Sequence, residues 1–424
     1  MHSATQQLED VTQRKARVEF RHYVLFQVLF TLAFLVLVFG GVEFLARIRQ
    51  YQRFGPKSLH PLALRDQFTG YRLNPAYGRV DRQHDAQGFR RDRDVALEKP
   101  PNTVRIFIIG GSTAYGYTTN MPEYTDNRWR LLYNNQTIDY YLEQKLNQAF
   151  PAKNWEVINA AAPNFQMNQE LAEIESVLLR YRPDCIILLD GHNDLHALWN
   201  HANKDYDPYA HVEGSEEFNL LANPGSFRSL LFFLANWIHT NSAAFRIVQD
   251  HLRSMEVSLR PAERRKGRVS NPVKLSDLTT LEQAKFATAQ SQLAFYTHTV
   301  QQIRRILDLD GVRAIFLLQP EVFLTRKQLT DSERRMLDDE LTAAGRTYCF
   351  QRLFPEIAAS MTTTARQEGF VFLNLTDAFD QASQQTFSDD AHLTPEGNRI
   401  IAERLFWLIK DMFADQAKIN SRPK

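Results

Sequence analysis

The feature that most constrains this fold is a repeated alternation of short apolar runs with segments of helical periodicity. Each run has five or six residues, is rich in β-branched and aromatic side chains, and ends at a polar or glycine-containing turn, as buried strands do. The runs are 105–109, 155–159, 185–189, 313–318 and 370–375, and the main helical segments are 137–150, 170–181, 229–238, 281–309 and one that begins at 394. Strands separated by helices predict an α/β fold with a five-stranded parallel sheet covered on both faces.

Residues 23–46 are apolar except for Gln27, Thr31 and Glu43. About 20 apolar residues are enough to cross a bilayer as a helix. A cleaved signal peptide would have a shorter apolar stretch and a small-residue cleavage site, and a buried core helix rarely stays this apolar over so many positions. We therefore expect a single-pass transmembrane anchor at 23–46.

Lysines and arginines flank both ends of the anchor, so the positive-inside rule does not decide its orientation. Only a short segment precedes it, which favours a cytoplasmic tail at 1–22 and a body on the extracytoplasmic (periplasmic) side of the cell membrane. The expected parts are then a juxtamembrane connector at 47–101, a catalytic domain at 102–415 and a C-terminal tail at 416–424. Within that domain we expect helical insertions at about 195–280 and 320–350.

Composition narrows the possible partners. The formal net charge is +1, which gives no reason to expect nucleic acid. Cys185 and Cys349 are the two cysteines, and no spacing indicates a metal site. Cys185 is expected to be a buried thiol, and pairing of the two stays open. A basic tract at 260–268 is either a solvated loop or a surface for an anionic substrate or lipid headgroups.

Polar side chains suited to acyl transfer follow the ends of the predicted strands. Ser112 follows the first strand, Asn193 the third, and Asp389 and His392 come after the fifth. Carboxyl ends of parallel strands share one edge of the sheet, where ligand sites lie. Acyl transfer needs a nucleophile, a base, an acid that orients the base, and donors for the oxyanion. The sequence therefore predicts one site at this edge.

Three blocks of sequence resemble the SGNH (GDSL-type) hydrolases in order and spacing. They are Gly-Gly-Ser at 110–112, Gly-His-Asn-Asp at 191–194 and Asp-Asp-Ala-His at 389–392. Gly-Phe-Arg at 88–90 resembles a membrane-anchored bacterial subgroup of that family. The resemblance covers about residues 85–413. It implies a flavodoxin-like three-layer α/β/α fold and chemistry that needs no metal or organic cofactor.

The resemblance also implies a role for each matching residue. Ser112 would attack the ester carbonyl, His392 would act as general base and then general acid, and Asp389 would hold the imidazole tautomer. The oxyanion hole would consist of the Ser112 backbone N–H, the Asn193 side chain and the backbone N–H of Asn164.

The chain departs from the family pattern at two positions. Asn164 stands where the family usually has glycine, although asparagine tolerates left-handed backbone better than most residues. Gly111 replaces the usual aspartate before the serine. Asp390 is expected to be solvated, and it is the alternative triad acid if the register differs. His192 and Asp194 are expected to shape their loop.

These features predict a serine esterase of the SGNH type. It would cleave O-acyl esters, such as acetyl esters, of an envelope glycan or lipid through an acyl-serine intermediate. One alternative is an O-acyltransferase that modifies an extracellular polysaccharide with the same triad. The other is a non-catalytic, membrane-tethered module that binds or assembles polysaccharide.

Overall fold

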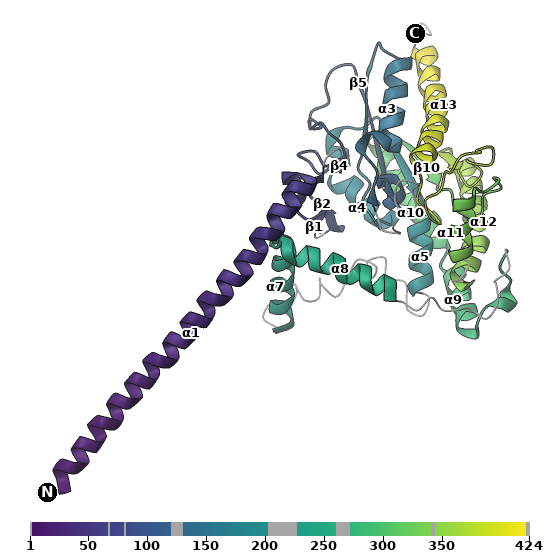
Figure 1. Ribbon diagram of the computed structural model, residues 1–424. Helices are drawn as coiled ribbons and strands as arrows, with labels where there is room; N and C mark the ends of the chain where they lie inside the picture. The colour runs from purple at the N-terminus through teal and green to yellow at the C-terminus, as the bar shows by residue number, and fades with distance from the viewer. Residues whose placement is uncertain are drawn as a thin grey trace.

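A computed structural model describes residues 2–66, 68–79, 82–119, 130–201, 227–259, 272–340 and 344–420. Figure 1 shows a compact α/β body with a long helix, α1, projecting from it. Before the main sheet come α1 (His2–Phe54), η1 (Pro56–Leu59), β1 (Ala63–Asp66), β2 (Gly70–Leu73), β3 (Gly78–Arg79) and β4 (Arg82–Gln83). The short elements beside the main strands are α2 (Ser112–Tyr115), β6 (Tyr117–Thr118), β7 (Arg130–Leu131), η2 (Asn134–Gln136), η3 (Leu178–Tyr181) and η4 (Leu275–Asp277).

The central sheet confirms the predicted fold class. Its strands are β5 (Thr103–Gly110), β8 (Asn154–Asn159), β9 (Cys185–Asp190), β10 (Arg313–Leu318) and β11 (Val371–Asn374). They lie in the order β11-β10-β9-β5-β8, and every pairing is parallel. Counted along the chain this is the flavodoxin-like order 2-1-3-4-5, whose direction of winding reverses between β5 and β9. A ligand site is expected outside the carboxyl ends of those two strands.

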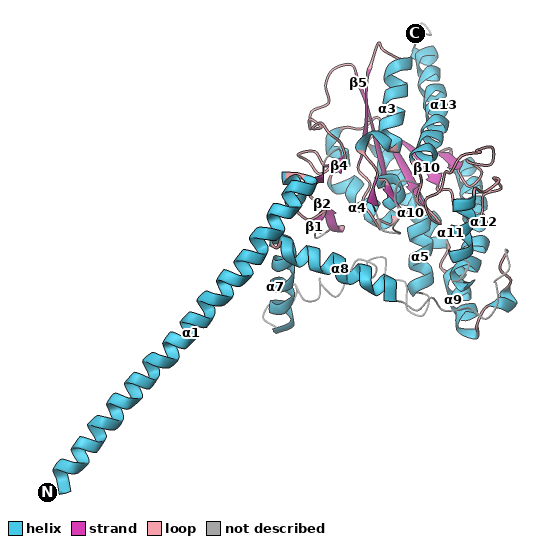
Figure 2. Ribbon diagram, viewed as in Figure 1, coloured by secondary structure: helices cyan, strands magenta, loops and turns pink. Residues whose placement is uncertain are grey.

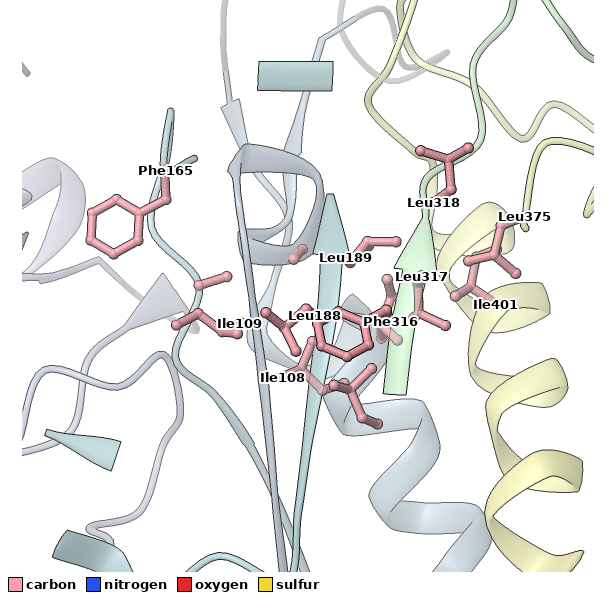
Figure 3. Close-up of a cluster of buried hydrophobic side chains, with 14 of the residues drawn as sticks. Ile108, Ile109, Phe165, Leu188, Leu189, Phe316, Leu317, Leu318, Leu375 and Ile401 are labelled. Atoms are coloured by element: carbon pink, nitrogen blue, oxygen red, sulfur yellow. The ribbon is translucent and has the colours of Figure 1, made fainter. Parts of the chain in front are cut away.

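The strands form because both of their faces are covered. Every residue of β5 and β9 is buried, which explains why residues 106–109 and 185–189 are continuous apolar runs rather than alternating ones. Figure 3 shows side chains of β5, β9 and β10 packed side by side, with Leu375 and Ile401 closing one end of the cluster.

Helices cover the sheet in two layers (Figure 2). In one layer, α3 (Ile138–Ala149) packs on α13 (Pro395–Asn420), and in the other α10 (Ala294–Leu309) packs on both α4 (Met167–Ser176) and α12 (Ala344–Glu368). The remaining helices are α5 (His192–His201), α7 (Phe227–Asn241), α8 (Ala243–Leu259), α9 (Thr280–Ser291) and α11 (Asp331–Glu340).

The expected single helix at 281–309 is wrong, because the segment is divided into α9 and α10 around Gln292 and Leu293. α9 packs on α5 and α12, whereas α10 packs on α4, α12 and β10. The break lets one segment of chain serve both sets of neighbours.

Helix α1 continues well past the apolar run, to Phe54. Residues Phe20–Gln52 make it the one helix in the described part of the chain that is long and apolar enough to cross a membrane. Its large apolar side chains are exposed, among them Phe30, Phe34 and Leu37. Nothing within the described body covers them.

The two cysteines are buried and unpaired. Burial raises the pKa of both the Cys185 and the Cys349 thiol to about 12, so neither is a reactive thiolate at neutral pH. The basic tract at 260–268 lies outside the described residues.

Candidate active site

Ser112 is the first residue of α2 and follows two glycines, Gly110 at the end of β5 and the N-cap Gly111. Gly110 has a φ of 155°, and a Cβ there would come within 2.6 Å of the Leu189 carbonyl oxygen. Only glycine at this position lets the chain turn sharply at the end of β5 while it lies so close to the backbone of β9. This turn places the serine hydroxyl at the point where the sheet's winding reverses.

The structure brings Ser112, His392 and Asp389 together. The Ser112 Oγ lies 2.7 Å from Nε2 of His392, and the other ring nitrogen, Nδ1, lies 2.8 Å from both carboxylate oxygens of Asp389. The network assigns the proton of the neutral ring to Nδ1. Nδ1–H then donates to Asp389, and Nε2 accepts from the serine hydroxyl.

Asp389 is fixed by donors besides the imidazole. The backbone N–H groups of Ala391 and His392 donate to its Oδ1 at 3.1 and 2.7 Å. The hydroxyl of Thr119 lies 2.9 Å from its Oδ2. Burial alone would raise the pKa of Asp389, but His392 and these backbone donors hold it well below its usual range. The carboxylate is therefore ionised at neutral pH.

Asn193 lies against Gly111, the residue before Ser112. Its side-chain amide nitrogen, Nδ2, donates to the Phe165 carbonyl at 2.8 Å. A Cβ at Gly111 would lie only 2.1 Å from the same nitrogen. The amide thus fills the space in which a side chain at 111 would begin, which gives a physical reason for glycine where the family resemblance would put aspartate.

Asn164 occupies the left-handed region expected of it, with a φ of 64°, and it is exposed. It directly precedes Phe165, whose carbonyl accepts from Asn193. The second and third loops therefore meet next to Ser112.

The expectation that Asp390 is solvated is wrong. Its side chain is buried, and its Oδ2 lies 2.9 Å from a guanidinium nitrogen of Arg346. A charge in this position needs a partner because burial removes its water. Asp389, not Asp390, contacts the imidazole.

His192 is held by a carboxylate that spacing could not reveal. Its Nδ1 lies 2.9 Å from Oε1 of Glu321, which is fully buried. Burial lowers the pKa of His192, but the Glu321 charge outweighs this and raises it to about 9. On the other side of Asn193, Asp194 accepts from the Met167 N–H at 3.0 Å. Asn193 is thus anchored through both neighbours.

Arg90, from the Gly-Phe-Arg block, supports the turn that carries Ser112. It is fully buried, and its guanidinium donates to the carbonyls of Tyr115, Gly116 and Leu132. Asn159 adds a bond from its amide to the Ala114 carbonyl at 2.9 Å. Together they satisfy the carbonyls of Ala114, Tyr115 and Gly116 at the end of α2, for which the helix itself has no donors left. Sequence reasoning missed these supports, as it missed Thr119.

Three acidic side chains, Glu170, Asp190 and Asp194, are gathered beneath the Asn193 loop. Burial, with Asp190 close by, raises the pKa of Glu170 well above its usual range. Burial raises the pKa of Asp194 to about 6. These raised pKa values favour the neutral acids, which limits the number of negative charges buried together.

The described residues contain no group of three or more His, Cys, Asp or Glu side chains that could hold a metal ion. A cavity of about 820 Å³ lies at the opposite, amino-terminal edge of the sheet, lined by residues such as Lys99, Arg182 and Arg313. It is separate from the triad.

Fold and site together define a class: α/β proteins with a 2-1-3-4-5 sheet and a Ser–His–Asp arrangement at the switch point. No family model matches the sequence, and no curated protein does. Solved structures with a similar fold include a lipase/acylhydrolase from Enterococcus faecalis (12% identity, 73% of this chain and 96% of that chain covered, TM-score 0.37). A catalytic mutant of an acetylxylan esterase from Geobacillus stearothermophilus also matches (12% identity, 71% of this chain and 91% of that chain covered, TM-score 0.34). A GDSL-like lipase from Bacteroides thetaiotaomicron is a third match (9% identity, 73% of this chain and 88% of that chain covered, TM-score 0.31).

Proposed function

We propose that this protein is a serine esterase that removes O-acyl groups, such as acetyl, from an envelope glycan or lipid. The observation that carries the proposal is the unbroken chain of contacts from Ser112 Oγ to His392 Nε2 at 2.7 Å, and from His392 Nδ1 to Asp389 at 2.8 Å. An isolated serine hydroxyl is a weak nucleophile, and an adjacent oriented base is what activates it.

In the first half-reaction, Ser112 Oγ bonds to the ester carbonyl carbon while its proton passes to His392 Nε2. The carbonyl electron pair moves onto oxygen and gives a tetrahedral oxyanion. As this collapses, the bond to the alcohol breaks and Nε2 returns its proton to the leaving oxygen. Water then attacks the acyl-serine in the same way and releases the carboxylic acid and free Ser112. Asp389 stays ionised and stabilises the imidazolium.

The oxyanion would be met by donors from three loops. An amide nitrogen carries two protons, and Asn193 uses one on Phe165, which leaves one for the substrate. The Ser112 N–H, at the start of α2, and the Asn164 N–H would supply the others. Each such donor is worth roughly 10²–10³ in kcat.

Helix α1 would hold this domain at the membrane. Residues 23–42 precede Glu43 and are long enough for the roughly 30 Å hydrocarbon core at 1.5 Å per residue. With 1–22 in the cytoplasm, the esterase domain would face the extracytoplasmic side, where acylated glycans and lipids are found.

A fluorophosphonate probe tests nucleophile activation without knowledge of the substrate. The full chain in detergent micelles should be labelled at Ser112, and Ser112→Ala should abolish labelling and hydrolysis of p-nitrophenyl acetate. Ser291→Ala is the matched control, because that exposed hydroxyl only bonds within its own helix, to the Thr288 carbonyl. Equal and slow hydrolysis by wild type and Ser112→Ala would sink the proposal.

The acceptor is identified by a second measurement. Acetate release that is unchanged by added polysaccharide identifies an esterase. Acetyl transfer to the polysaccharide at the expense of release identifies the acyltransferase instead.

A further inference from the structure

Helices α7 and α8 expose apolar faces close to the point where α1 enters the body. The exposed fractions of Leu230, Leu234 and Trp237 on α7 are 61, 50 and 63%. These positions, spaced by four and three residues, share one side of a helix. Arg228 and His239 are the only titratable side chains in α7. On α8, Val248 and Leu252 form a similar exposed pair.

The apolar stripe of α7 does not face the body, because the one residue that the helix buries there is a serine. Ser229 is fully buried, and Phe232 on the same side lies under the guanidinium of Arg65, 3.8 Å from its ring centroid. A surface helix of a water-surrounded protein turns its apolar stripe toward the core. Helix α7 does the reverse, which indicates a non-aqueous environment outside.

The corner between α7 and α8 is fastened to α1 by Glu43. Its carboxylate accepts from the backbone N–H groups of Ala243 and Ala244 at 2.9 and 3.0 Å, and from the Ser242 hydroxyl at 2.7 Å. It therefore caps α8, whose first N–H groups have no partner within the helix. This explains the one acidic residue in the apolar run.

Two arginines complete the corner. Arg47, one helical turn after Glu43, pairs with it at 2.7 Å and donates to the Asn241 carbonyl. Arg246 donates to the carbonyls of His239 and Thr240 at the end of α7 and to Leu59 beside η1. The orientation of both helices relative to α1 is thereby fixed.

We propose, resting on the membrane anchoring of α1 proposed above, that the α7–α8 hairpin is a second membrane contact that lies in the lipid interface. The partner is the bilayer, because the exposed faces adjoin the apolar surface of α1 at its carboxyl end. In Figure 1, α7 points from the corner toward the same side as the free end of α1, and α8 crosses beneath the body. Helix α7 has 15 residues, or about 22 Å, too short to span but typical of an interfacial helix.

The test places an environment-sensitive NBD fluorophore on α7 of the full chain, through Trp237→Cys, in vesicles of phosphatidylethanolamine and phosphatidylglycerol. The matched control is Trp407→Cys on α13, a tryptophan of similar exposure. Cys185 and Cys349 are buried and should not react. Nitroxide lipids should quench the probe at 237 several-fold more strongly than the probe at 407, with a blue-shifted emission at 237 only.

A second variant guards against a misplaced probe. Leu230→Glu with Leu234→Glu should abolish quenching at 237 and leave hydrolysis of a soluble ester unchanged, since neither residue touches the triad. Equal quenching at 237 and 407 overturns the proposal. So does crosslinking between two chains at 237 in place of quenching, because the occupant is then a second copy.

An alkaline carbonate wash separates this proposal from the anchor. A chain that resists the wash but shows no quenching at 237 keeps the α1 anchor and loses the hairpin contact. A chain that is quenched at 237 before the wash and then removed by it keeps the hairpin contact and loses the anchor.

Discussion

Asp389 and Glu43 are both carboxylates that accept from two consecutive backbone N–H groups, but their surroundings differ. Asp389 is buried in the body, and His392 links it to the hydroxyl of Ser112. Glu43 lies among exposed apolar side chains of α1, and it binds the first backbone N–H groups of α8. The comparison teaches that one kind of contact serves two purposes. The buried carboxylate orients an imidazole beside Ser112, and the half-buried one fixes α8 to α1.

The largest effect should come from Asp389→Asn. The amide cannot hold the imidazole in the required tautomer, so we expect kcat for a p-nitrophenyl ester to fall by about 10⁴-fold with little change in folding. Asp390→Asn is the control, since Asp390 pairs with Arg346. It should lose stability rather than most of its activity. The opposite pattern would show that the other aspartate is the acid.

The second largest effect is expected for Arg90→Met. This substitution tests how far the structure around Ser112 depends on the buried hydrogen bonds of Arg90. The substitution leaves several buried carbonyls at the end of α2 without donors, and each costs about 1–3 kcal/mol. We expect a loss of at least about 3 kcal/mol in the free energy of unfolding, measured with urea. Arg334→Met, at an exposed ion pair, should cost under about 1 kcal/mol. Equal losses of unfolding free energy in the two variants would show that the buried hydrogen bonds of Arg90 do not stabilise the fold.

Glu170→Gln should change the pH dependence of stability. The folded state raises the pKa of Glu170, so between the ordinary carboxyl pKa and this raised value it binds more protons than the unfolded state. Stability therefore falls as pH rises between these two values, by about 1.4 kcal/mol for each pH unit. The neutral amide should flatten this decline in melting temperatures measured from pH 5 to 9. Glu175→Gln, at an exposed position, should follow wild type, and an unaltered slope in Glu170→Gln would contradict the assignment.

The smallest effect is expected at the half-buried carboxylate, Glu43. Glu43→Ala removes the cap of α8, worth about 1 kcal/mol, and should speed hydrogen exchange at Ala243 and Ala244 about fivefold while esterase activity stays unchanged. Gln27→Ala, elsewhere in α1, should leave exchange at these amides as it was. A loss of activity in Glu43→Ala would mean that the two regions are coupled rather than separate.

The sequence was most informative where burial is complete. β9, for example, is apolar from Cys185 to Leu189 because both of its faces are covered. Such runs located the sheet and the polar residues at its edge. It was least informative where a partner comes from a distant part of the chain. The burial of Asp390 depends on Arg346, and the role of Arg90 depends on the carbonyls of α2. Periodicity and spacing carry no record of such pairs. The break between α9 and α10 was missed for the same reason, since it follows from their different neighbours.

The hydrogen bonds between Glu43 of α1 and the start of α8 have a mechanical consequence. Because a side chain of α1 caps α8, any rotation of α1 about its own axis turns the body with it. A partner protein that bound α1 would therefore always meet the same side of the body.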